Sequence, residues 1–152
     1  MRSALTALAK FLSTYRDLGL LVFRLVLGGM FMWHGWPKIV GGAAGWEKLG
    51  QAMGTFGITF APTFWGFMAS FSEFGGGLMV ALGLFYRIGA LLLFFTMFTA
   101  FNTQMVGGKG LSKASQSLEV GFSFLAAAFI GPGKYSLDYF FQLEETEKRG
   151  PR

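Results

Sequence analysis

Long apolar segments constrain this chain more than any other feature of its sequence. They cover approximately residues 18–38, 61–85, 88–106 and 112–130. A helix needs ~20 mostly apolar residues to cross the hydrocarbon core of a bilayer, and each segment is close to that length. Only 14% of the residues are charged, whereas soluble domains carry about 25%. The sequence therefore predicts an all-α protein, an antiparallel bundle of four transmembrane helices.

Two short amphipathic segments accompany the predicted spans. Residues 1–17 place apolar side chains on one helical stripe, as a helix in the membrane interface does, namely Leu5, Leu8, Leu12 and Tyr15. A secretory signal peptide is the alternative, but the apolar run that follows ends in Trp-His-Gly-Trp-Pro rather than at a small-residue cleavage site. A second interfacial helix is predicted in the Gly-rich connection 43–60, where Trp46, Leu49 and Met53 recur at helical spacing.

The connections and flanking charges predict the topology. Tyr86 and Arg87 form a very short turn, so the second and third spans are expected to be antiparallel neighbours. Lysines and arginines are more numerous on the side that holds this turn and both termini. The positive-inside rule then places both termini in the cytoplasm, with the protein in a bacterial-type inner membrane. We divide the chain into an interfacial segment (1–17), a membrane domain (18–140) and a charged C-terminal tail (141–152).

Ionisable residues within the predicted spans mark the candidate site. Charge at membrane depth is costly, so such residues usually pair with one another or face a bundle interior. Glu73 and Glu119 each share a helix face with small residues, which favour contact with neighbouring helices. We expect a polar cluster near the outer face, closed from the cytoplasmic side by Arg24. Its predicted members are His34, Lys38, Glu73, Gln104, Gln116 and Glu119.

Each of these residues also has a structural interpretation. Glu73 is either a buried ion-pair partner of Arg24 or Lys38 or a carboxylate that binds a proton. Lys38 can instead reach the membrane interface, and His34 can belong to an aromatic belt with the neighbouring tryptophans. The Phe-rich third span favours lipid-facing packing over the wall of a quinone or haem site; its phenylalanines are Phe94, Phe95, Phe98 and Phe101.

Composition removes several classes of chemistry. The chain has no Cys and one His, which excludes thiol chemistry, iron–sulfur ligation, thiolate zinc sites and a multi-His metal centre within one chain. No intrinsic cofactor or metal is therefore predicted, and catalysis by this chain alone is not expected. The net charge is +5, but the basic residues flank apolar runs, so they indicate contact with lipid head groups rather than with nucleic acid.

Several motifs together resemble the DoxX family of small four-helix membrane proteins. They are RLVLGGMFMWHGWPKIVGG (24–42), SEFGGGLMVALGLFYRIGALLL (72–93) and GPGKYSLD (131–138). The resemblance covers about residues 18–140. It implies that the positions that matter are Arg24, Lys38, Glu73, Arg87 and Glu119, together with Gly131, Gly133, Ser136 and Asp138 of the last motif.

The resemblance also implies a link to redox processes, because relatives are associated with quinone-linked and oxidative-stress complexes. The leading expectation is an auxiliary subunit of a membrane redox complex, with a quinone or a lipid near the polar cluster. Sulfur chemistry would have to lie on a protein partner, since the chain has no Cys. The alternatives are a small proton-linked transporter that uses Glu73 and Glu119, and a structural subunit that stabilises a larger complex or homo-oligomer.

Overall fold

A computed structural model describes residues 2–144, and within them the regular secondary structure is entirely helical, which confirms the predicted all-α class. The predicted tail 141–152 lies outside the described residues beyond Glu144. The elements are α1 (Arg2–Thr14), α2 (Arg16–Ile39), α3 (Gly42–Gly50), the 3₁₀ helix η1 (Gln51–Phe56), α4 (Pro62–Leu82), α5 (Tyr86–Val106), α6 (Leu111–Ile130) and α7 (Leu137–Phe140).

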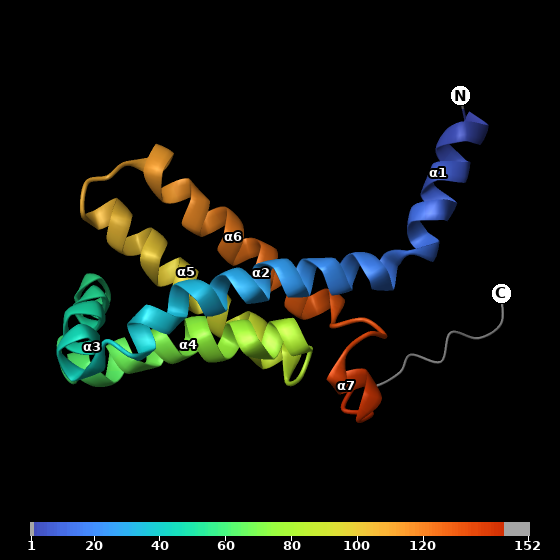
Figure 1. Ribbon diagram of the computed structural model, residues 1–152. Coiled ribbons are helices and arrows are strands. Elements are labelled where there is room, and N and C mark those ends of the chain that lie inside the picture. Colours follow the sequence, from blue (N-terminus) through green and yellow to red (C-terminus); the bar gives the residue numbers. More distant parts are fainter. Residues whose placement is uncertain (1, 145–152) are drawn as a thin grey trace.

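The long helices pack in pairs. Helix α2 lies along α4, α5 lies along α6, and α4 also contacts α5 and α3 (Figure 1). Glycines allow the first pair to approach closely. A Cβ atom added at Gly28 would lie 2.6 Å from the backbone nitrogen of Ala81, and one added at Gly77 would lie 2.8 Å from the carbonyl oxygen of Gly28. Small residues at such contacts are typical of helix packing in membranes.

The core of the bundle is small and its exterior is strongly apolar. Tyr86, Leu93 and Phe124 are fully buried. Large apolar side chains such as Trp33 and Phe129 are 76% and 80% exposed. By length and composition, two of the described helices, α2 and α5, could cross a membrane. An exterior of this kind is expected where lipid rather than water covers the protein.

The turn between α4 and α5 lies earlier than predicted. Helix α4 ends at Leu82, and Gly83 adopts a left-handed conformation with φ of 65°. The Gly83 and Leu84 amides then donate to the carbonyls of Val80 and Met79, which closes the last turn of the helix. Tyr86 consequently belongs to α5, so the prediction of a turn at Tyr86 and Arg87 is wrong.

The Gly-rich connection 43–60, in which a short helix was predicted, packs against α4 through α3 and η1. A Cβ atom at Gly66 would overlap the Trp46 carbonyl, and one at Gly50 would overlap the Pro62 carbonyl. The Trp46 indole also donates to the Lys38 carbonyl at 3.0 Å, which joins α3 to the end of α2. Helix α1 differs, because none of its residues is buried and it projects from the opposite end of the bundle (Figure 1).

Candidate functional site

An ion pair joins the last turn of α2 to the middle of α4. Lys38 Nζ donates to both carboxylate oxygens of Glu73 at 2.6 Å. The Glu73 side chain is 6% exposed and that of Lys38 is 39% exposed. This pairing is one of the two predicted for Glu73. An ammonium group has three protons, so Lys38 keeps one donor for a further partner.

Two cavities meet at this ion pair. We call the first, of about 500 Å³, the inner cavity; Glu73 lines it together with a mainly apolar wall that includes Met53, Phe56, Trp65, Met68, Phe95 and Phe98. We call the second, of about 660 Å³, the mouth cavity; its polar lining is Lys38, Lys48, Gln51, Thr55, Ser70 and Thr103. Lys38, Leu49 and Ala52 line both cavities, so the two spaces adjoin.

The hydroxyl groups of the inner cavity already have acceptors. Ser72 donates to the Met68 carbonyl at 2.7 Å, and Thr96 and Thr99 donate to carbonyls within α5 at 2.9 Å. The Trp65 indole nitrogen is buried and has no hydrogen-bond partner within the described residues. A buried donor without an acceptor is unfavourable. The inner cavity therefore suits a mainly apolar molecule, and the Lys38 ammonium is the donor at its border.

The single cluster predicted from the sequence does not form, because α6 packs mainly on α5. Gln116 and Glu119 are exposed on α6, and His34 is exposed on α2. Gln104 donates to Ser117 Oγ at 2.8 Å, which joins α5 to α6 away from the ion pair. The prediction that the site around Glu73 includes His34, Gln104, Gln116 and Glu119 is therefore wrong. A proton relay between two buried carboxylates, Glu73 and Glu119, does not form because Glu119 is exposed.

Arg24 is also placed differently from the prediction. Its side chain is buried at the other end of the bundle and donates to four backbone carbonyls, at 3.2 Å to Val80 and Ala81, 2.8 Å to Pro132 and 2.9 Å to Tyr135. It is therefore neither the partner of Glu73 nor the floor of a cluster around it. The cause is the packing of α2 beside the end of α4, which brings Arg24 next to Gly83.

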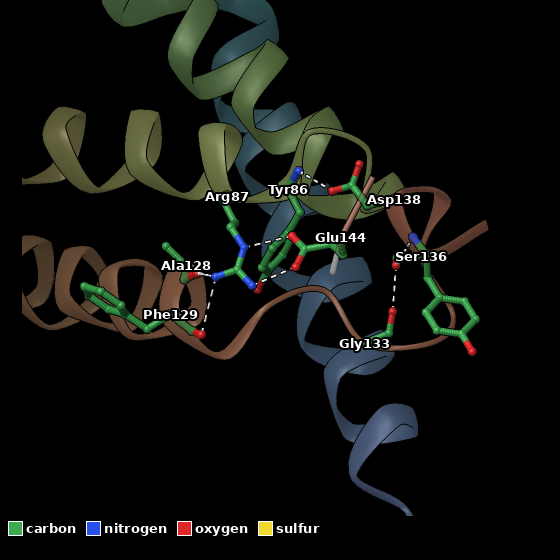
Figure 2. Close-up of polar contacts among 9 residues, drawn as sticks. Tyr86, Arg87, Ala128, Phe129, Gly133, Ser136, Asp138 and Glu144 are labelled. Carbon is green, nitrogen blue, oxygen red and sulfur yellow. Dashed lines mark hydrogen bonds and ion pairs between the residues drawn. The ribbon is translucent and has the colours of Figure 1, made fainter. Parts of the chain in front are cut away.

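The motif after α6 forms a clamp at this second end, which Figure 2 shows. The Asp138 carboxylate accepts hydrogen bonds from the Phe85 amide at 2.7 Å and the Tyr86 amide at 2.8 Å, and so caps α5. Ser136 donates to the Gly133 carbonyl at 2.6 Å and accepts from the Tyr139 amide at 3.2 Å.

Arg87 completes the clamp (Figure 2). It forms a two-point ion pair with Glu144, at 2.8 and 2.7 Å, and donates to the Ala128 carbonyl. Gly131 and Gly133 have φ of 85° and 76°, which other residues rarely adopt. The side chains of Arg87, Ser136 and Asp138 bind backbone groups or, for Arg87, also Glu144, and Gly131 and Gly133 supply the positive φ angles. These five residues therefore have structural roles.

Several lining residues escaped the sequence analysis. Lys48 lies in the predicted interfacial helix of the connection 43–60 but was not named as a site residue, and Phe98 was assigned to lipid-facing packing. One signal was present in the third span, where Thr96, Thr99 and Thr103 recur at helical spacing and form a polar stripe. In the structure all three residues line one of the two cavities.

Comparison with known proteins agrees with the resemblance in the sequence. The family model described as DoxX matches residues 19–105. The inner membrane protein YqjF of Escherichia coli (strain K12) is 35% identical over 125 residues, which are 80% of this chain and 91% of that protein. No solved structure matches the chain.

Proposed function

Because this chain belongs to the DoxX family of membrane proteins, we propose that it binds a lipid-soluble molecule with a polar head at the Lys38–Glu73 ion pair. The molecule would lie in the inner cavity. The observation that carries this proposal is an ion pair with a buried carboxylate that borders a mainly apolar space of about 500 Å³. Buried ion pairs contribute little to stability compared with apolar residues of similar size, which favours a role in binding.

The lining of the inner cavity matches the chemistry of a quinone. A quinone has two carbonyl acceptors on an otherwise apolar ring. The third Lys38 proton is a donor still available to one of these carbonyls. Phe56 and Phe98, whose ring centres are 6.4 Å apart, offer flat apolar surface for the ring.

The proposed setting is the inner membrane, with α2, α4, α5 and α6 as four spans. The termini would face the cytoplasm, and α1 and α3 would lie at the membrane interfaces. In support, α4 carries one charged residue, Glu73, and Lys38 neutralises it. This topology places both cavities toward the outer face.

The proposed role is that of an auxiliary subunit in a quinone-linked complex. The chain has no Cys and one His, so electron transfer would rely on a partner protein while this chain holds or positions the quinone. Affinity purification in a mild detergent tests this part. A companion protein at a fixed stoichiometry is expected, and a lone monomer would contradict the subunit role.

Quinone binding is tested on protein purified from membranes. We expect quinone in the extracted lipids and a rise in melting temperature when a short-chain quinone is added. Glu73→Gln is the informative variant, because it keeps the side-chain shape and removes the charge that orients Lys38. It should lose most of the temperature rise. Absence of both quinone and thermal shift in the wild type would contradict the proposal.

A further inference from the structure

The mouth cavity has an imbalance of charge. Lys38 and Lys48 are among its lining residues, and none of its lining residues is acidic. Glu73 neutralises Lys38 but lines the inner cavity instead. Lys48 takes part in no ion pair within residues 2–144. One positive charge therefore remains uncompensated at the rim of the mouth cavity.

The other polar groups of the mouth cavity leave few acceptors. The Thr55 hydroxyl donates to the Ala52 carbonyl at 2.8 Å and accepts from the Asn102 amide at 2.9 Å. Thr103 donates to the Thr99 carbonyl at 2.9 Å. The groups with donors to spare are the two ammonium groups and the Gln51 amide. A site rich in donors and positive charge favours an anionic oxygen group.

We propose that the mouth cavity is a subsite for a phosphate-type anion, held by Lys48 and the Gln51 side-chain amide. Lys38, Leu49 and Ala52 line both cavities, so a lipid can place its phosphate in the mouth cavity and an acyl chain in the inner cavity. A free anion in the mouth cavity, beside a separate apolar ligand in the inner cavity, would present the same negatively charged oxygen atoms. This inference rests on the proposed function, which assigns the inner cavity to a lipid-soluble molecule.

The test compares phosphatidylglycerol with diacylglycerol of the same acyl chains, which lacks the phosphate, each titrated into the full-length protein in neutral detergent. Native mass spectrometry measures binding, and thermal melting shows that each variant is folded. We expect the anionic lipid to bind about tenfold more tightly, as one extra charged hydrogen bond would give. Lys48→Gln should remove most of that preference.

Lys109→Gln is the matched control. Lys109 is exposed in the connection between α5 and α6 and lines neither cavity, so this variant removes the same charge without touching the subsite. It should leave the preference unchanged. Equal binding of the two lipids without any effect of inorganic phosphate, or an equal loss in both variants, would overturn the subsite.

Inorganic phosphate separates the two sources of the anion. Phosphate that raises the melting temperature of the wild type, but not of Lys48→Gln, supports the subsite with a free anion as its occupant. A lipid preference without any phosphate effect supports the lipid. A short-chain neutral quinone serves as the third ligand. If it still stabilises the wild type while the lipids bind equally and phosphate has no effect, the anion subsite alone is wrong. If no ligand binds, the proposed function fails as well.

Discussion

Lys38 contacts both carboxylate oxygens of Glu73 at 2.6 Å, so a single ammonium group compensates the carboxylate in the middle of α4. The two residues differ in burial, since Lys38 borders the mouth cavity and Glu73 is 6% exposed. The pair therefore places a charged, hydrogen-bonding end on an otherwise apolar cavity. The joining of α2 to α4 depends on it, and so does the ligand recognition that we propose.

Removal of Glu73 should destabilise the protein. Glu73→Ala strands Lys38, and we expect a loss of about 3 kcal/mol, the lower end for broken buried pairs because Lys38 can turn toward solvent. A paired replacement, Lys38→Met with Glu73→Leu, should recover most of that loss, since it leaves no charge unpaired. Denaturation in mixed micelles measures both variants. An unchanged midpoint for Glu73→Ala would show that the pair contributes nothing to folding.

The close contact between α3 and α4 makes Gly66 intolerant of a side chain. A Cβ atom there would overlap the Trp46 carbonyl, so Gly66→Ala should cost about 1–3 kcal/mol through displaced backbone. Gly29→Ala is the control, because a Cβ atom at Gly29 has no neighbour within 4 Å. Thermal melting compares the two variants, and equal melting temperatures would contradict the observed packing.

Asp138 should be needed for the order of the end of the bundle that holds Arg24 and the start of α5. Asp138→Ala removes the acceptor for the Phe85 and Tyr86 amides, with an expected loss of about 1–2 kcal/mol, as for other helix caps. Asp138→Asn keeps one acceptor oxygen and should lose less. Hydrogen exchange at the Phe85 and Tyr86 amides reports the effect directly. Unchanged protection in Asp138→Ala would mean that these amides have another acceptor.

Membrane topology can be tested by cysteine labelling, because the chain has no native Cys that would react with a thiol reagent. Single cysteines at Ser3 and Ser112, both exposed, should react with an impermeant thiol reagent from opposite sides of the membrane. We expect Ser112→Cys to be labelled in intact spheroplasts and Ser3→Cys only after lysis. Labelling of both from one side would contradict the proposed topology, which puts three spans, α2, α4 and α5, between Ser3 and Ser112.

The sequence predicts the helices better than their partners. Periodicity and the positions of the glycines suffice to predict helices, but the sequence left the partner of Glu73 open between Arg24 and Lys38, and the structure pairs it with Lys38. Arg24 was misplaced because its partners are backbone carbonyls, among them those of Pro132 and Tyr135 far along the chain, and carbonyls carry no sequence signal. Glu119 was misplaced because a small-residue face does not reveal which neighbouring helix it contacts.

The turn after α4 shows the same limitation at short range. Gly83 indicates the end of a helix in the sequence. The left-handed φ of 50° at Phe85 has no such signal, because phenylalanine rarely adopts this conformation. Asp138 holds it there from a distant segment. The cavities were unpredictable for a related reason, because their walls combine residues of α3, η1, α4 and α5 that meet only through tertiary packing.

Photo-crosslinking with an azido-quinone, followed by mass spectrometry of the labelled peptides, tests directly whether the inner cavity binds a quinone. We expect label on the inner-cavity residues Met53, Met68 and Phe98. Ala100→Phe should abolish this labelling because Ala100 lines the inner cavity, while Ala126→Phe on the exposed surface of α6 should not. Label confined to lipid-facing positions of α6, or equal labelling in Ala100→Phe, would contradict a ligand site beside Lys38 and Glu73.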